Sequence, residues 1–119
     1  MDLKQLRAKG AFIKAPPVPT EVTWVHNDPE TNEEVTDTFT VHVRRMSIGW
    51  LDRVIGPGTQ NPLRSRTAAL ISEGVLLGED GAESISYADA YQLDFGLATA
   101  LLNAFNRVNS KEEGAAPKS

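Results

Sequence analysis

The sequence predicts an α+β fold: a mainly helical single domain with an N-terminal antiparallel β-hairpin packed on helices. Two patterns lead to this prediction. Residues 21–45 alternate apolar and polar side chains with a period of two, which is typical of strands. Residues 47–109 repeat apolar side chains largely at helical spacing. A chain of 119 residues has the length of one ordinary domain, which we assign to residues 1–109.

Composition narrows the class of protein. Hydrophobic residues make up 40% and charged residues 24%, which suits a globular protein and not a wholly disordered chain. The lack of cysteine excludes disulfides, thiol catalysis and cysteine-ligated zinc. A net charge of −4 disfavours a nucleic-acid partner, because phosphate binding needs a basic surface. No apolar run is long enough for a signal peptide or a membrane span, so we expect a cytoplasmic protein without a membrane partner.

The N-terminal segment predicts a short helix followed by a stiff connection. Asp2 favours the start of a helix over residues 2–9, and Gly10 ends it. The proline-rich residues 15–19 are better interpreted as a rigid lead into the first strand than as a docking motif. The apolar side chains that we expect to face inward here are Leu3, Leu6 and Phe12.

Two alternating segments predict the hairpin. Between them, the acidic residues 27–34 include a proline and predict a long, solvated tip. A lone hairpin is marginally stable in water, so its apolar face must pack on helices. The side chains that share a face within each strand are Val22, Trp24 and His26 in the first, and Phe39, Val41 and Val43 in the second.

Two helices are predicted after the hairpin. Ser47 is suited to cap a helix that runs to about Ile55, where a Gly-Pro-Gly segment ends it. Pro62 fits the first position of the next helix, which ends near Gly74. Residues 75–77 are too few to classify.

The last predicted element is one long helix over residues 86–108. Asp80-Gly81 predicts a tight turn before it, and Ser86 is its expected N-cap. After Asn109 the composition changes, and we expect residues 110–119 to form a disordered tail. The helix carries two apolar stripes, which together exceed the arc that a surface helix usually buries: Tyr87, Tyr91, Phe95, Ala98, Leu102 and Phe105 in one, and Ala90, Leu93, Leu97, Leu101, Ala104 and Val108 in the other.

No set of residues predicts catalysis, a metal site or a cofactor. The alternation places His26 beside Trp24 but His42 on the side opposite Phe39, so the two histidines do not predict a metal site. The glycines at 56 and 58 are not followed by the lysine of a phosphate-binding loop. No serine lies in a nucleophile-elbow context. We therefore expect a protein that is not an enzyme.

The order of elements over residues 66–109 resembles the small tail assembly chaperones of lambda-like siphophages. Residues 2–4 and 39–44, with the hairpin, are similar to the front half of several such proteins. The features that carry the resemblance are the helix with Arg66 and Leu70-Ile71, the Asp80-Gly81 turn, the Ile85-Ser86 start and the leucine-rich last helix.

This resemblance implies a non-enzymatic protein that binds the long, helical tape measure protein before the tail tube forms. The partner would stay soluble, because an exposed apolar helical stripe aggregates unless it is covered. The resemblance also implies recruitment of tail tube subunits, a role in the host cell cytoplasm and absence from the mature virion. We expect partner contacts at Trp50, Leu51, Leu93, Leu97, Leu101 and Val108.

The wide apolar face allows other interpretations. It also fits a core helix buried on several sides, or a homodimer interface. We expect a homo-oligomer, which replacing Leu97 and Leu101 with glutamate would dissociate. Alternative functions are another small phage structural protein, in head–tail joining or the tail tube, and a small regulatory or enzyme-associated domain.

The resemblance further implies two lengths of product, the longer made by a backward ribosomal slip near the end of the reading frame. Ala116-Pro117-Lys118 permits the codons GCC-CCA-AAA or GCC-CCA-AAG, which contain a slippery run. Asp2-Leu3-Lys4 permits one as well, but a slip at the C-terminal end preserves the folded domain. The appended module on the longer form would recruit the tail tube protein.

Overall fold

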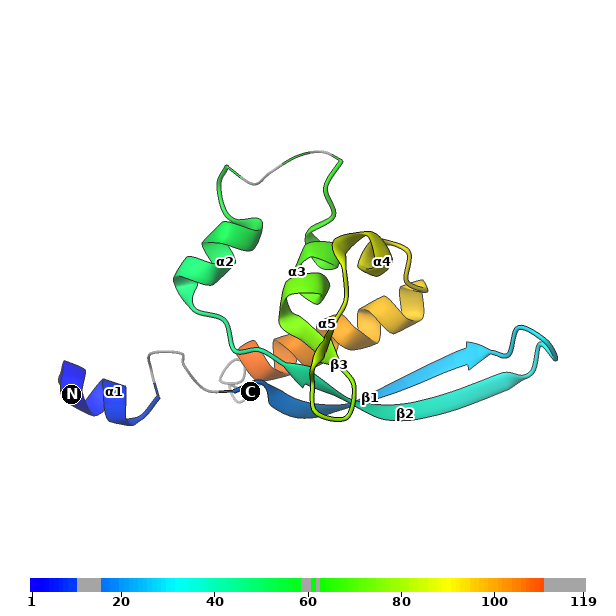
Figure 1. The fold of residues 1–119 in the computed structure, drawn as a ribbon, viewed down its shortest axis with the longest axis horizontal. Helices are drawn as coiled ribbons and strands as arrows, with labels where there is room; N and C mark the ends of the chain where they lie inside the picture. The colour runs from blue at the N-terminus through cyan, green and yellow to red at the C-terminus, as the bar shows by residue number, and fades with distance from the viewer. Residues whose placement is uncertain (11–15, 59–60, 62, 111–119) are drawn as a thin grey trace, which may run out of the picture.

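The structure, a computed structural model, describes residues 1–10, 16–58, 61 and 63–110 of the chain. Helices and strands form two layers, with α2 to α5 on one side of the sheet (Figure 1). In chain order the elements are α1 (Leu3–Ala8), β1 (Val18–Asn27), β2 (Glu34–Val43), α2 (Ile48–Ile55), α3 (Arg66–Gly74), β3 (Val75–Leu77), β4 (Glu83–Ser84), α4 (Tyr87–Tyr91) and α5 (Phe95–Asn109).

Within the described residues the sheet has four antiparallel strands in the order β1-β2-β3-β4. The predicted hairpin is confirmed, and its register runs from Val18 opposite Val43 to Asn27 opposite Glu34. The sequence analysis missed the two short strands, since three and two residues are too few to show a period. Because β3 pairs with β2 only at His42 and Val43, the far part of the hairpin is two-stranded and projects beyond the helices (Figure 1).

The core lies between the inner face of the sheet and the helices α3 and α5. The predicted alternation is confirmed, because Val22, Val41 and Val43 are buried whereas Thr23 and Thr40 are exposed. Helix α3 contributes Ile71, and α5 contributes Leu101, Ala104 and Phe105. The result is one continuous apolar cluster that fixes the helices on the sheet.

The predicted start of the second helix is wrong. The second helix begins at Arg66 and not at Pro62, because the hydroxyl of Ser65 caps it by accepting from the backbone N–H of Ala68 at 3.0 Å. Pro62 itself lies outside the described residues.

The single helix predicted over residues 86–108 is two helices, α4 and α5. Ser86 is the N-cap of α4, as predicted, and accepts from the N–H of Asp89. The chain leaves the helix after Tyr91, and the Asp94 carboxylate caps α5 by accepting from the N–H of Leu97 at 3.1 Å. A carboxylate at this position starts a new helix in place of continuing the old one.

Helix α1 is present where the sequence predicts it, but its predicted burial is wrong. Asp2 and Gln5 form a reciprocal capping box, and Gly10 follows the helix at φ +82°. No residue of α1 is buried, and Leu3 is 63% exposed. Phe12, the third expected inward side chain, lies outside the described residues, as does the predicted tail beyond Ser110.

Candidate partner-binding surface

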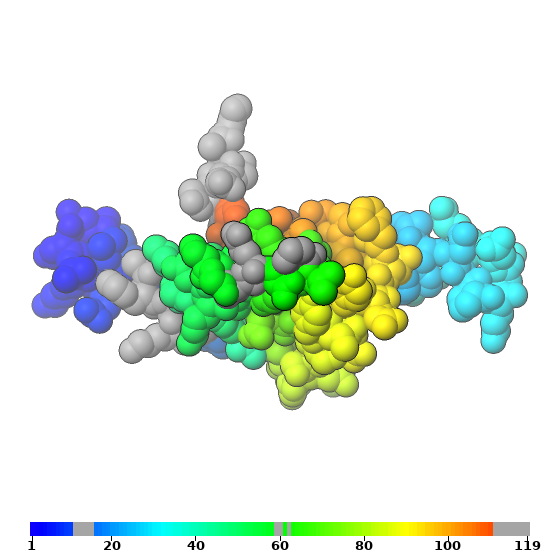
Figure 2. Space-filling model, turned by 90° about the horizontal axis from the view of Figure 1, so that it is seen from above, coloured from blue at the N-terminus to red at the C-terminus, as the bar shows by residue number. Residues whose placement is uncertain are grey.

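An apolar groove runs between α3, α4 and α5. It encloses about 350 Å³, and small residues such as Ala68, Ala90 and Ala98 leave the space open. Figure 2 looks onto this helical side of the molecule, with α3 in green and α4 in yellow. The other residues that line the groove are Ser65, Thr67, Tyr91, Leu93, Phe95, Thr99 and Leu102.

Two exposed aromatic rings stand at this groove. Phe95 is 86% exposed and Tyr91 is 64% exposed, although both are large and apolar. Tyr87 stacks on Tyr91 with ring centroids 6.1 Å apart and extends the aromatic surface along α4. We call these three residues the aromatic ridge. Exposed aromatic side chains beside an apolar groove are typical of a protein-binding surface.

Local capping and one long hydrogen bond hold the ridge in place. The phenol of Tyr87 accepts a hydrogen bond from the backbone N–H of Ser65 at 2.8 Å, which ties α4 to the start of α3. The break then makes Phe95 the first residue of α5, four positions after Tyr91, the last residue of α4. The groove therefore depends on the break that separates the two helices.

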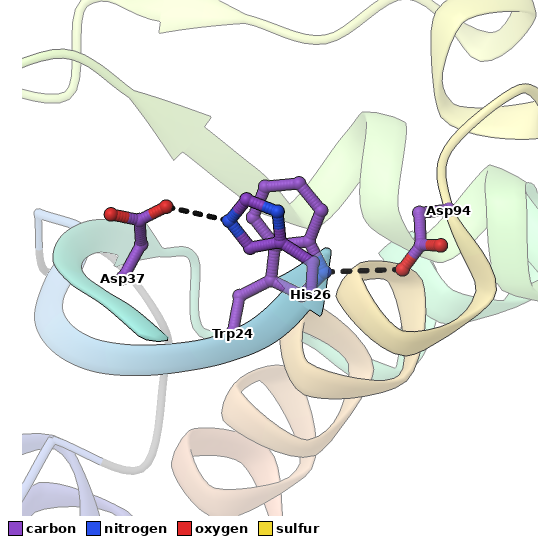
Figure 3. A network of polar contacts seen from close by, with 4 residues as sticks. All are labelled: Trp24, His26, Asp37 and Asp94. Carbon is purple, nitrogen blue, oxygen red and sulfur yellow. Dashed lines mark hydrogen bonds and ion pairs between the residues drawn. The ribbon is translucent and has the colours of Figure 1, made fainter. Parts of the chain in front are cut away.

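A polar junction joins the hairpin to the start of α5 (Figure 3). The indole N–H of Trp24 donates to the Asp94 carboxylate at 3.1 Å. The ring of His26 stacks on Trp24 with centroids 3.6 Å apart, and its Nε2 lies 2.7 Å from a carboxylate oxygen of Asp37. The Trp24–Asp94 bond ties the hairpin to the start of α5, whereas the contacts of His26 lie within the hairpin and support the Trp24 ring.

Asp94 carries the electrostatic part of this junction. The hydrogen bond from Trp24 holds the pKa of the Asp94 carboxyl below its ordinary value, and the N–H of Leu97 lowers this pKa further. The carboxylate is thus stabilised in its charged form at neutral pH. Its arrangement suits structural anchoring, because the carboxylate accepts hydrogen bonds from the indole of Trp24 and from the backbone N–H of Leu97.

The structure brings together few of the partner-binding residues predicted from the sequence. Leu93 lines the groove. Leu97 and Val108 are half-buried and pack against the core, and Leu101 is 2% exposed and lies within it. Leu101→Glu would therefore place a carboxylate in the core, so it tests stability and not an interface.

Trp50 and Leu51 lie apart from the groove, on α2. Both are half-buried and pack against the core. The guanidinium of Arg44 lies 5.1 Å from the centroid of the Trp50 ring, so part of this ring is covered by a cation–π contact. The exposed apolar residue of this helix is Ile48, at 81%.

The sequence analysis did not select the aromatic ridge or the Trp24–Asp94 contact. The ridge residues belong to the first of the two predicted stripes, and their pattern alone does not say which stripe faces solvent. Trp24 and Asp94 are 70 positions apart in the chain, and only the packed fold places them together.

Two classes of site have no support in the part of the chain that the structure describes. No three side chains of His, Asp or Glu come together there as a metal ion would require. His26 and His42 lie on opposite sides of the sheet, as the alternation predicts. Within the same residues, no helix is both long and apolar enough to cross a membrane.

Comparison with known protein families decides the family of this chain. The family described as "Phage tail assembly chaperone, TAC" matches residues 4–109, from within α1 to the end of α5. The chain belongs to this family. The match includes the groove, the aromatic ridge and the hairpin of this tail assembly chaperone. No curated protein and no solved structure matches the chain.

Proposed function

We propose that this tail assembly chaperone binds the tape measure protein by receiving one of its amphipathic helices in the groove between α3, α4 and α5. The observation that carries the proposal is the groove itself, with Tyr91 and Phe95 exposed beside it. An apolar stripe on a partner helix would displace water from both surfaces, and this favours binding. The family membership supports a partner among the tail proteins.

The role is non-enzymatic and precedes completion of the virion. The chaperone keeps the tape measure protein soluble in the host cytoplasm, and it is absent from the mature particle. A longer, frameshifted form recruits the tail tube protein. Several copies act together as a homo-oligomer, because a long partner helix offers many repeats of one apolar stripe.

Co-expression with the cognate tape measure protein tests this function. We expect the chaperone to raise the soluble yield of that protein and to co-purify with it. Phe95→Ser together with Tyr91→Ser should weaken the complex roughly 30-fold, equivalent to about 2 kcal/mol, since exposed aromatic residues dominate such interfaces. An insoluble tape measure protein, with no complex formed by the wild-type chaperone, would contradict the proposal.

Phe95→Ser is also tested alone, and Ile48→Ser is its matched control. Ile48 is 81% exposed and Phe95 is 86% exposed, so both changes remove an apolar side chain from solvent without opening the core. Ile48 lies on α2 and does not line the groove. Equal losses of binding in the two variants would indicate a general surface effect and would remove the groove from the proposal.

The alternative of a tail tube component has less support. Tube proteins are dominated by strands, whereas helices account for more of the described residues than strands do here. Most of the exposed large apolar side chains among the described residues also lie on helices, namely Leu3, Ile48, Tyr87, Tyr91 and Phe95. A circular dichroism spectrum of the purified chain dominated by strand would favour the alternative.

A further inference from the structure

Helix α1 is a folded helix whose apolar side chains stay accessible, because Leu3 is exposed and Leu6 is only half-buried. Its capping box is complete, yet none of its residues is buried. Met1 is 79% exposed, and Leu3 is 63% exposed. Leu3 and Leu6 are three residues apart and so lie on one face of the helix. An apolar helical face of this kind is stabilised when another surface covers it.

The same helix lies at the basic end of the molecule. It carries Lys4 and Arg7 and is followed by Lys9, whereas its only acidic neighbour, Asp2, is engaged in the cap. A Cβ on Gly10 would lie 4.0 Å from the guanidinium of Arg45, so the α1 exit lies beside further positive charge.

The opposite end of the molecule has the complementary surface. A cleft of about 620 Å³ opens beside the hairpin, with the Trp24–His26 stack in its wall and the carboxylates of Glu34 and Asp94 at its side. The lining also includes apolar atoms of Val25 and Pro29. Between residues 16 and 43 the chain has six acidic residues and no lysine or arginine: Glu21, Asp28, Glu30, Glu33, Glu34 and Asp37.

The two surfaces cannot meet within one folded copy. The molecule extends 58 Å along its longest axis. Both Figure 1 and Figure 2 show α1 at one end of this axis and the β1–β2 turn at the other. A contact between them must therefore join two copies, either in a head-to-tail chain or in a reciprocal dimer in which each α1 enters the cleft of the other copy.

We propose that α1 of one copy binds in the hairpin cleft of another copy. The apolar face with Leu3 and Leu6 covers the wall at Trp24, and Lys4 and Lys9 approach the acidic strands. A second copy is the occupant because both complementary surfaces belong to this chain. The proposal goes beyond chaperone function and does not depend on it, because the contact needs no tape measure protein.

A small, charged interface has consequences that can be measured. A helix of six residues buries too little area for a permanent complex, so self-association should be weak and concentration-dependent. It should also weaken as salt rises from about 0.05 M to about 0.5 M, because the charges are exposed and screened.

Paired charge reversal tests the contact in the full chain. The first variant combines Lys4→Glu with Lys9→Glu, and the second combines Glu30→Lys with Glu34→Lys. Each variant alone brings like charges together at the contact, so sedimentation velocity should show self-association weakened roughly tenfold or more. An equimolar mixture should associate again, because each variant then meets a partner of opposite charge at both of its surfaces.

Glu79→Lys with Glu83→Lys is the matched control for the second variant. It makes the same change in net charge at exposed residues of the β3–β4 region, away from both surfaces, and should associate as the wild type does. Circular dichroism checks that each variant is folded, and a chain that carries all four reversals should self-associate. Wild type that stays monomeric at about 1 mM in low salt, or a mixture that stays monomeric, would overturn the proposal.

Discussion

At the scale of single residues, Asp94 accepts one hydrogen bond from a distant strand and one from the helix that it caps. One comes from the indole of Trp24 on the hairpin, and the other from the backbone of Leu97 on the same helix. Because Asp94 also ends the connection from α4, its carboxylate positions the hairpin and the aromatic ridge together. The polar junction is therefore the residue-level link between the two proposed binding surfaces.

The charge of Asp94 gives a testable pH dependence. Its folded-state pKa is lowered below the ordinary value of 3.8, so its carboxylate contributes stability above that value, and this contribution is lost as pH falls through the folded pKa. Asp94→Asn keeps an oxygen for the cap but removes the charge. We expect a lower melting temperature than wild type at pH 7 and a smaller difference at about pH 3. A difference of equal size at both pH values would contradict the charged role.

At the scale of elements, the end of α3 packs very closely on α5. A Cβ on Gly74 would lie 2.5 Å from Cε1 of Phe105 and 3.1 Å from Cε of Met46. Gly74 and Phe105 are both buried, so neither the ring nor the helix has free space into which to move. The absence of a side chain at residue 74 thus sets the distance between these two helices.

Gly74→Ala should destabilise the fold by about 1 to 3 kcal/mol, because it overpacks the contact between α3 and α5. Gly49→Ala is the control, since it adds the same methyl group inside α2, where nothing lies within 4 Å. That change should stabilise the fold by about 0.5 to 1 kcal/mol. Urea denaturation of both variants measures the two effects, and equal effects of the same sign would contradict this account.

The sequence predicted the elements whose determinants are local. The alternation of residues 22–26 and 39–43 predicted two strands and their inner faces, and Ser47 and Ser86 predicted two helix starts. The sequence prediction failed where the apolar repeat continues across a polar residue that separates two helices. The stripes run unbroken past Asp94, so the pattern predicted one helix although this carboxylate caps a second one.

At the scale of the whole molecule, the candidate surface could not be predicted because it arises from packing. The groove needs α3, α4 and α5 in their final places, and Leu101, expected at an interface, turns inward once α5 packs on the sheet. The family, in contrast, was predicted from the order of elements and is confirmed. The order of elements can be predicted correctly even when helix boundaries are wrong. The exposure of one side chain, in contrast, depends on every neighbouring element.

The end of α5 explains how a longer product can keep the same fold. The side chain of Asn109, its last residue, accepts from the backbone N–H of Met46 at 2.7 Å and donates to the carbonyl of Arg44 at 3.1 Å. These bonds attach the helix end to the connection between β2 and α2. A module appended after residue 110 therefore follows a completed domain and leaves its core unchanged.

We expect the gene to encode Ala116-Pro117-Lys118 as GCC-CCA-AAA or GCC-CCA-AAG, with an open −1 frame that continues past Ser119. Mass spectrometry of the expressed gene should then show two products that share residues up to the slip. Synonymous codons that abolish the run should remove the longer product and leave the amount of the shorter one nearly unchanged. Because Asn109 is the last residue of α5 and both products contain it, they should also share one thermal transition for this domain. Other codons at 116–118 in the natural gene, or an early stop in the −1 frame, would exclude recoding at this position.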